Sequence, residues 1–129
     1  MNPPRILVAD DEPDLRDLVS DYLGMQGFDV VTAADAQAMD ARLAEGAVDV
    51  IVLDVNMPGL SGIEAARLYR SSTPPGERVP ILGLTADATA QTAERCLAAG
   101  MTACLVKPLR PSALLDALDR ALAAQGRTG

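Results

Sequence analysis

One stretch of the chain, VDVIVLDVNMPGLSG at residues 48–62, constrains the fold more than any other. It opens with a short apolar run rich in β-branched residues, which is typical of a strand buried on both faces of a parallel sheet. The run ends at Asp54, and the Asn-Met-Pro-Gly that follows favours a turn, because proline lacks a backbone donor. Asp54 is therefore predicted at the carboxyl end of a strand, where ligands bind in open α/β sheets. An aspartate in this place also commonly caps a turn or a helix, so the position alone leaves both roles open.

The same alternation of a short apolar run with a helical pattern continues along the chain. Strands are predicted at residues 5–9, 28–33, 48–53, 79–85 and 102–106. Helices are predicted from residue 13 to the glycines at 24 and 27, from 36 to the glycine at 46, from 63 to a loop at 71–76, over 88–99, and from about 111 to 122. Five strands alternating with five helices predict an α/β protein with a single parallel sheet covered by helices on both faces.

The length of 129 residues suits one domain, which we expect to span residues 1–129 with its core at about 4–123 and a short tail at 124–129. The formal net charge of −7 opposes binding to nucleic acid or to an anionic membrane surface. No apolar run approaches the roughly 20 residues of a membrane span, and no signal-peptide core is present. A cytoplasmic location is therefore the default expectation.

Polar residues follow four of the five predicted strands, namely Asp10 and Asp11, Asp54, Thr85 and Lys107. Because all strands of a parallel sheet end at the same edge, these side chains are predicted to converge on one pocket. Several carboxylates in one cleft repel one another, which favours a bound cation. The chain has no histidine and its two cysteines lack metal-ligand spacing, so oxygen ligands and a hard metal such as Mg²⁺ are indicated.

A lysine and a hydroxyl beside a metal and a carboxylate resemble the machinery of phosphoryl transfer, in which cations neutralise the oxygens of the moving group. In this interpretation Asp54 is the nucleophile and forms an aspartyl phosphate, while Lys107 and Thr85 contact phosphate oxygens. Each residue also has a purely structural interpretation. The acidic run at residues 10–12 would favour a helix N-terminus, Thr85 would cap the following helix, and Lys107 would be a solvated side chain. The joint placement at one edge is what favours a site.

The motifs Asp10-Asp11, LDVNMPGLSG carrying Asp54, LTA carrying Thr85, and Lys107-Pro108 are similar to those of the receiver domain of two-component response regulators. They occur in the expected order and at the expected separations over essentially the whole chain. The resemblance implies a flavodoxin-like three-layer fold with the sheet order 2-1-3-4-5. It implies a phosphoacceptor signalling domain and not an enzyme, with self-catalysed phosphoryl transfer and autodephosphorylation as its only chemistry. The run GLTADAT and the loop at 71–76 further resemble receivers fused to hybrid histidine kinases.

The resemblance also implies a phosphoryl donor and a metal. Asp54 would accept phosphate from a phosphohistidine on a histidine kinase or a histidine phosphotransfer protein. Mg²⁺ or Mn²⁺ would be held by Asp11, Asp54 and the backbone carbonyl of Asn56, with Asp10 acting mostly through water.

Binding of the phosphoryl group is implied for residues on the neighbouring loops. Lys107 and Thr85 would bind phosphate oxygens, together with the backbone N–H groups of Asn56 and Ala86. The peptide bond between Lys107 and Pro108 would be cis, as in relatives, and would aim the lysine inward.

One position departs from the family pattern. Receivers commonly carry an aromatic switch residue three positions before the conserved lysine, and here that position is Cys104. In relatives the ring turns inward when the conserved hydroxyl moves toward the phosphoryl group. A cysteine is too small to reproduce that movement, so a different or smaller surface change is expected. Asn56 and Asp87 occupy the two variable positions that tune phosphate lifetime in the family.

Two other functions remain open from the sequence. A small haloacid-dehalogenase-type phosphatase also uses an aspartate nucleophile and Mg²⁺, but its second acid, two positions after the nucleophile, is Asn56 here. A receiver-like interaction module that never needs phosphate is the other alternative, and Cys104 favours it because it suggests altered switching. In both signalling interpretations the chain acts by contact with other proteins, without nucleic acid or membrane partners.

Overall fold

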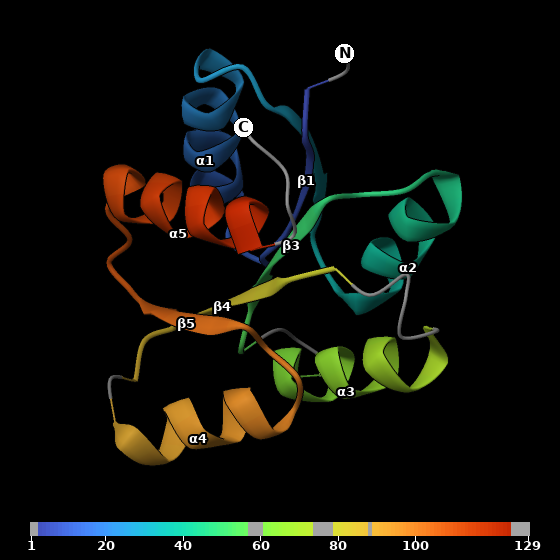
Figure 1. The fold of residues 1–129 in the computed structure, drawn as a ribbon, viewed down its shortest axis with the longest axis vertical. Helices are drawn as coiled ribbons and strands as arrows, with labels where there is room; N and C mark the ends of the chain where they lie inside the picture. Colours follow the sequence, from blue (N-terminus) through green and yellow to red (C-terminus); the bar gives the residue numbers. More distant parts are fainter. Residues whose placement is uncertain (1–2, 57–60, 74–78, 88, 125–129) are drawn as a thin grey trace.

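The computed structural model describes residues 3–56, 61–73, 79–87 and 89–124, and Figure 1 shows their arrangement. The strands are β1 (Arg5–Ala9), β2 (Asp29–Ala33), β3 (Val50–Asp54), β4 (Ile81–Thr85) and β5 (Ala103–Val106). The helices are α1 (Pro13–Met25), α2 (Ala36–Glu45), α3 (Gly62–Ser72), α4 (Ala90–Ala98) and α5 (Pro111–Ala124). The predicted alternation of strands and helices is confirmed over this part of the chain.

The strands form one parallel sheet in the order β2-β1-β3-β4-β5, so the predicted sheet order is confirmed. The central strands β3 and β4 are buried along their whole length, which explains why their sequences are continuously apolar instead of alternating. The edge strands β2 and β5 are more exposed. In Figure 1, α1 and α5 cover one face of the sheet, and α2, α3 and α4 cover the other.

Two hydrophobic layers, one on each face of the sheet, hold the helices in place. Because side chains alternate along a strand, β3 directs Ile51 and Leu53 into one layer and Val50 and Val52 into the other. Contributions from the helices to the first layer include Met39, Ile63, Ala65, Ala66 and Cys96, and those to the second include Val19, Leu23, Leu114, Leu118 and Leu122. Aliphatic side chains thus build the core, in keeping with an aromatic content of 2%.

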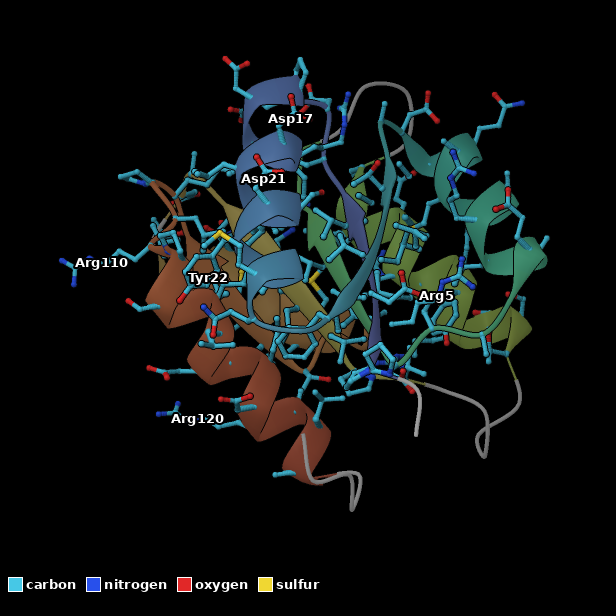
Figure 2. All side chains as sticks on the ribbon, turned by 90° about the horizontal axis from the view of Figure 1, so that it is seen from above. Arg5, Asp17, Asp21, Tyr22, Arg110 and Arg120 are labelled. Atoms are coloured by element: carbon cyan, nitrogen blue, oxygen red, sulfur yellow. The ribbon has the colours of Figure 1, made fainter. Side chains whose placement is uncertain are left out.

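The outer surface of the helices α1 and α5 is charged. Figure 2 shows Asp17 and Asp21 on the outer side of α1, and Arg110 and Arg120 extending away from the α5 side of the domain. Leu18 lies between the two aspartates in sequence and is 53% exposed. Leu18 therefore lies outside the buried face of α1, to which Val19 and Leu23 belong.

Most predicted boundaries hold to within a few residues. The helix α1 begins at Pro13, as predicted, but continues through Gly24 to Met25. A glycine inside a helix costs about 1 kcal/mol relative to alanine, which the packing of the flanking residues outweighs here. The turn after the helix contains Gly27, whose φ of 93° lies in the region that favours glycine.

The helix α4 begins two residues later than predicted. The side chain of Thr89 accepts the backbone N–H of Thr92 at 3.3 Å and so caps the helix before Ala90. Ala88 lies outside the described residues.

The predicted loop at 71–76 overlaps the end of α3, which reaches Ser72, and residues 74–76 lie outside the described part of the chain. Of the tail predicted at 124–129, Ala124 ends α5 and the remainder is likewise outside it. Among the described helices, none has the length and apolar character needed to cross a membrane.

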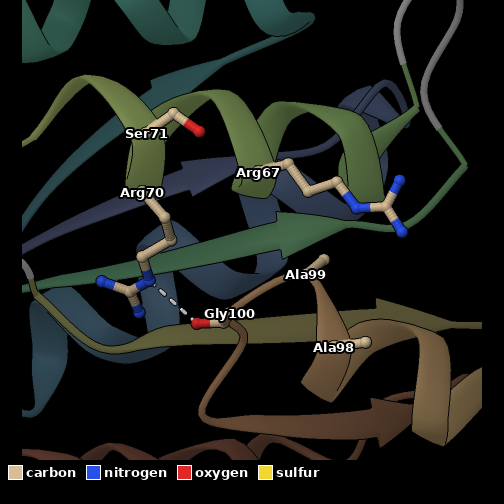
Figure 3. Close-up of a pocket in the computed structure, with 6 residues that line it drawn as sticks. All are labelled: Arg67, Arg70, Ser71, Ala98, Ala99 and Gly100. Atoms are coloured by element: carbon tan, nitrogen blue, oxygen red, sulfur yellow. Dashed lines mark hydrogen bonds between the residues drawn. The ribbon is translucent and has the colours of Figure 1, made fainter.

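A pocket of about 580 Å³ lies between α3 and the end of α4, and Figure 3 shows its lining. Arg70 donates from Nε to the Gly100 carbonyl at 2.9 Å and from Nη1 to the Val79 carbonyl at 2.7 Å. A Cβ atom at Gly100 would lie 2.6 Å from Cγ of Arg70, and the φ of Gly100 is 97°. The arginine therefore joins α3 to the turn after α4. Both helices end here, so the pocket is at the opposite edge of the sheet from the predicted site.

Candidate functional site

Two buried carboxylates lie at the carboxyl ends of adjacent strands. Asp10 directly follows β1, Asp54 ends β3, and the two residues are 0% and 2% exposed. Asp10 Oδ1 accepts the backbone N–H of Glu12 at 2.8 Å, and Asp54 Oδ1 accepts that of Asn56 at 3.1 Å. The turn-capping role that the sequence left open is therefore present at both residues. Each turn uses one carboxylate oxygen, which leaves the second oxygen for another partner.

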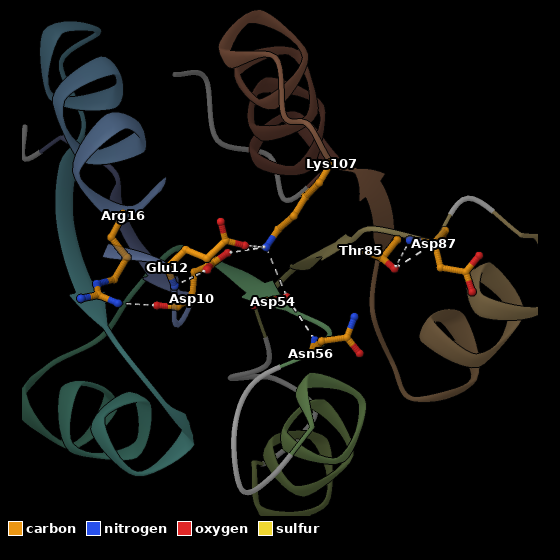
Figure 4. Close-up of polar contacts among 8 residues, drawn as sticks. All are labelled: Asp10, Glu12, Arg16, Asp54, Asn56, Thr85, Asp87 and Lys107. Carbon is orange, nitrogen blue, oxygen red and sulfur yellow. Dashed lines mark hydrogen bonds and ion pairs between the residues drawn. The ribbon is translucent and has the colours of Figure 1, made fainter. Parts of the chain in front are cut away.

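The side chain of Lys107 extends from the loop after β5 to these carboxylates (Figure 4). Its Nζ lies 2.8 Å from Glu12 Oε1, 3.2 Å from Asp10 Oδ2 and 3.6 Å from Asp54 Oδ1. The lysine side chain is only 17% exposed, and its peptide bond to Pro108 is cis. The interpretation of Lys107 as an ordinary solvated lysine is therefore wrong, because its ammonium group is the cation at the centre of an acidic cluster.

Glu12 is the member of this cluster that the sequence reasoning missed. Its carboxylate is 59% exposed, yet it makes the shortest of the three ion pairs with Lys107. Arg16 supports the same turn by donating from Nη1 to the backbone oxygen of Asp10 at 2.7 Å. The available signal was the run Asp-Asp-Glu, whose third residue was interpreted only as favouring the start of a helix.

The acidic turn offers several oxygens to a cation. Single carboxylate oxygens of Asp10, Asp11 and Glu12 lie within 4.8 Å of one another. Asp10 Oδ2 is buried and accepts no hydrogen bond from the described residues, although the Lys107 ammonium is close enough for an ion pair. The Asp11 side chain raises the pKa of Asp54, which indicates that Asp54 lies beside this group. A set of carboxylate oxygens, one of them buried and without a hydrogen bond from the described residues, fits a hard divalent cation.

Burial raises the pKa of the Asp54 carboxyl group from 3.8 to about 6. The N–H of Asn56 acts in the opposite direction, the hydrogen bond with Asp11 and the charge of Asp10 raise the pKa further, and Lys107 lowers it. Burial lowers the pKa of the Lys107 ammonium group, but Glu12 and Asp10 outweigh burial and hold that pKa above its usual value. The Asn56 N–H and the Lys107 ammonium group thus both favour the ionised form of Asp54, against the larger effect of burial.

Thr85 ends β4 and is 2% exposed. Its hydroxyl accepts the backbone N–H of Asp87 at 3.0 Å and donates to the Asp87 carbonyl at 3.4 Å (Figure 4). The suggestion that Thr85 caps α4 is wrong, because Thr89 is the cap. The hydroxyl is engaged with the loop before α4 and not with the acidic cluster. Ala86, which lies between these residues, is exposed.

The Asp87 carboxylate is also held by the start of α4. It accepts a hydrogen bond from Thr92 Oγ1 at 2.8 Å and another from the backbone N–H of Thr89 at 3.0 Å. The bond from Thr92, followed by that from Thr89, lowers the pKa of this carboxyl group. Asp87 is therefore turned toward α4, whereas Asn56, at the other variable position, is exposed beside Asp54.

Cys104 lies at the position where relatives carry the aromatic switch residue. It is half-buried on β5, and its thiol donates to Sγ of Cys96 on α4 across 3.4 Å. Burial, and then the contact with Cys96, raises the pKa of the Cys104 thiol to about 12. A contact between two sulfur atoms thus takes the place of a ring at this position.

The fold and this edge together define a class of protein, a doubly wound α/β domain with a ligand site of carboxylates and one lysine at the carboxyl edge of its sheet. The family model for the response regulator receiver domain matches residues 6–119. The chain belongs to this family and is a receiver domain of two-component signalling. The resemblance inferred from the motifs is confirmed, and the family match does not support the phosphatase alternative.

Relatives among curated proteins are much longer than this chain. The chain is 40% identical over 118 residues to the sensor histidine kinase RcsC of Salmonella typhi, covering 92% of this chain and 12% of the relative. It is 43% identical over 126 residues to the virulence sensor protein BvgS of Bordetella pertussis, covering 92% of this chain and 10% of the relative. The chain thus spans 10–12% of the length of these two relatives. The name of RcsC, a sensor histidine kinase, agrees with the predicted similarity to receivers fused to histidine kinases.

A solved structure matches over nearly the whole chain. The chemotaxis response regulator CheY4 of Vibrio cholerae has a TM-score of 0.87 and 36% sequence identity, and the match covers 94% of this chain and 100% of that one. The expected flavodoxin-like receiver fold is confirmed by this agreement together with the observed sheet order.

Proposed function

We propose that this receiver domain is a phosphoacceptor in which Asp54 takes a phosphoryl group from a phosphohistidine on a histidine kinase or a histidine phosphotransfer protein. The observation that carries the proposal is the position of Lys107 Nζ, which lies within 4 Å of carboxylates from the ends of β1 and β3. A cation held in this way counters the negative charge that arrives with a phosphoryl group.

Asp54 supplies the nucleophile. A bond forms between a carboxylate oxygen of Asp54 and phosphorus, while the bond between phosphorus and the imidazole nitrogen of the partner breaks and a proton replaces it on that nitrogen. These 129 residues contain no histidine, so the donor histidine lies outside them. Burial raises the pKa of Asp54 to about 6, and the positive charge of Lys107 acts in the opposite direction, favouring the ionised form that attacks phosphorus.

The acidic turn supplies the ligands for a divalent cation. Asp10, Asp11, Asp54 and the backbone carbonyl of Asn56 would hold Mg²⁺, or Mn²⁺, and the buried Asp10 Oδ2 without a hydrogen bond supports this donor set. The cation would neutralise oxygens of the incoming phosphoryl group. Like-charged carboxylates so close together would also repel one another less once a dication is bound.

Lys107 and Thr85 both exchange partners in this account. Lys107 is paired with the exposed carboxylate of Glu12, and a phosphoryl oxygen near Asp54 would compete for the same ammonium group. The Thr85 hydroxyl would leave the backbone of Asp87 to donate to another phosphoryl oxygen. Exposed backbone N–H groups at Asn56 and Ala86 complete the donor set, once Asn56 releases Asp54 Oδ1.

The output is a change of surface for a protein partner. Release of Asp87 by Thr85 would loosen the loop that leads to the capped start of α4. The phosphorylation state would reach a protein partner through the surface of α4 and β5. In this proposal residues 1–129 form a single domain that acts in the cytoplasm. Its own chemistry would be limited to accepting the phosphoryl group and hydrolysing it.

Intact-mass measurement after incubation with Mg²⁺ and acetyl phosphate tests the proposal. Wild type is expected to gain the mass of one phosphoryl group, whereas Asp54→Asn and the wild type with chelated metal gain nothing. Absence of an adduct on folded wild type, with acetyl phosphate and with a phosphorylated phosphotransfer protein, would make a phosphate-independent interaction module the better description.

A further inference from the structure

The two cysteines of the chain form a contact between α4 and β5 that the phosphoacceptor chemistry does not use. Their sulfur atoms are 3.4 Å apart. Cys96 is 0% exposed in the last turn of α4, whereas Cys104 is half-buried on the edge strand β5. Both are free thiols.

The surrounding backbone holds both thiols in place. The carbonyl of Cys96 accepts the N–H groups of Ala99 at 3.2 Å and Met101 at 3.1 Å, which fixes the end of α4. Cys104 pairs with Gly83 in the sheet, and a Cβ atom on that glycine would lie 3.5 Å from Cys104 Sγ. That distance is an ordinary van der Waals contact, whereas the same Cβ atom would lie 2.6 Å from Sδ of Met101, so the absence of a side chain at Gly83 leaves room for Met101 beside the two thiols. The two thiols are therefore held next to each other by the end of α4 and by the pairing of β5 with β4.

We infer that Cys96 and Cys104 are a disulfide-forming modification site, which links α4 to β5 covalently when the protein meets a hydroperoxide. A disulfide has sulfur atoms about 2.05 Å apart, so the pair needs to close by little more than 1 Å. Side-chain rotation and a small shift of α4 can supply this movement. The bridge uses no residue of the acidic cluster and does not depend on the proposed phosphoacceptor function.

The chemistry proceeds in two balanced steps. With hydrogen peroxide, the half-buried Cys104 thiol meets the oxidant first, its sulfur attacks one peroxide oxygen, the O–O bond breaks, and a sulfenic acid and one molecule of water form; an organic hydroperoxide releases an alcohol in place of this water. The Cys96 sulfur then attacks the Cys104 sulfur, the S–S bond forms, and the sulfenic oxygen leaves as a second molecule of water with the Cys96 proton. The two thiols lose two electrons in total, and the hydroperoxide is reduced.

The environment sets the speed of this reaction. The thiolate is the reactive form of cysteine, and the raised pKa of Cys104 leaves very little thiolate at neutral pH. The bridge is therefore expected to accumulate slowly during sustained oxidation and not to respond to a brief pulse. Once a sulfenic acid has formed, the adjacent Cys96 sulfur favours closure over further oxidation.

Mass spectrometry of the native protein with hydrogen peroxide as the oxidant tests the site. After quenching, unfolding and alkylation of remaining thiols, wild-type monomer is expected to have lost two hydrogen atoms and to carry no alkyl group. Dithiothreitol should restore both thiols. The variants Cys96→Ser and Cys104→Ser, each confirmed as folded by circular dichroism, should keep one alkylatable thiol or gain oxygen, and should never lose two hydrogen atoms.

Three outcomes would overturn the inference. The first is wild type that keeps two alkylatable thiols or gains oxygen on cysteine without closing a bridge. The second is a bridge that forms only after the chain is unfolded in urea, because then the native contact is not the cause. The third is a bridge between two molecules, recognised as a dimer that Cys104→Ser abolishes. Peptide mapping separates oxygen on Met101 from oxygen on the cysteines.

Discussion

Lys107 Nζ lies 2.8 Å from Glu12 Oε1, so the lysine that we propose to bind the phosphoryl group is held in this structure by a residue outside the predicted site residues. The pair joins the loop after β5 to the start of α1 across the carboxyl edge of the sheet. Because Glu12 is 59% exposed, the pair itself contributes little to stability, at most about 1 kcal/mol. In the proposed function its consequence is kinetic, since Glu12 would compete with the phosphoryl group for Lys107.

The variant Glu12→Gln should therefore be phosphorylated faster than wild type. Loss of a competing interaction of about 1 kcal/mol corresponds to a roughly fivefold higher rate. The time course of adduct formation with acetyl phosphate and saturating Mg²⁺, followed by intact mass, measures this rate. Glu64→Gln changes an exposed acid on α3 and should leave the rate as it is. A slower rate for Glu12→Gln would show that Glu12 assists the reaction instead of competing.

Replacing Asp54 by its neutral isostere should stabilise the metal-free protein at pH 8. Burial raises the pKa of Asp54 from 3.8 to about 6. The folded state therefore holds this proton more tightly than the unfolded state, and wild type gains stability as the pH falls from 6 toward 4. The Asp54→Asn variant lacks this titration. Its free energy of unfolding should exceed that of wild type by up to about 3 kcal/mol at pH 8, and this difference should shrink as the pH falls from 6 toward 4.

Urea denaturation at pH 8 and at pH 4.5 in the presence of a chelator measures the difference. Asp119→Asn, which removes an exposed acid of α5, is the control and should change little at either pH. An Asp54→Asn protein that is less stable than wild type at pH 8 would contradict the account of the site electrostatics.

Removal of the positive charge at Lys107 should destabilise the metal-free domain and make its stability depend on bound metal. In Lys107→Met the buried Asp10 and Asp54 lose their common counter-ion, which we expect to cost about 1–3 kcal/mol of unfolding free energy. Mg²⁺ should restore more stability to this variant than to wild type, because the dication replaces the lost charge. Thermal unfolding with and without Mg²⁺ tests this, with Lys107→Arg as the charge-retaining control. Equal Mg²⁺ effects on Lys107→Met and wild type would argue against a shared site.

Two glycine substitutions should have opposite effects. A Cβ atom at Gly62 would collide with the backbone carbonyl of Asp54 and lie 2.8 Å from Cα of Val55. Gly62→Ala should therefore cost more than about 2 kcal/mol and disturb the loop that carries Asp54. Gly24 has open space around its Cα within α1, so Gly24→Ala should stabilise by about 0.5–1 kcal/mol. Chemical denaturation of both variants provides the comparison, and a tolerated Gly62→Ala would show that the start of α3 can move.

The parallel sheet could be predicted because its signals are local. β-branched runs such as residues 50–53 form strands, and proline and glycine end them. Once the strands are parallel, the convergence of Asp10 and Asp54 at one edge follows from topology alone. The same reasoning could not decide whether each carboxylate caps a turn or binds a ligand. In the structure both carboxylates accept a backbone N–H from the turn that follows them.

Contacts between side chains of elements far apart in the sequence could not be predicted. The partner of Lys107 depends on where a long flexible side chain settles among several carboxylates, so Glu12 was missed. The hydrogen bonds of Thr85 depend on the path of the loop before α4, and the contact of Cys96 with Cys104 depends on how closely α4 packs on β5. A pattern of residue types does not encode such distances.

Locating the phosphate on the chain is the most direct test of the central claim. Borohydride reduction of the phosphorylated protein converts an aspartyl phosphate to homoserine, and peptide sequencing by mass spectrometry then identifies the modified residue. We predict homoserine at residue 54 and at no other acidic position, with none when metal is chelated. Homoserine at residue 10 or 11 instead of 54, or unmodified Asp54 in a protein that carries phosphate, would contradict the assignment of Asp54 as the phosphoacceptor.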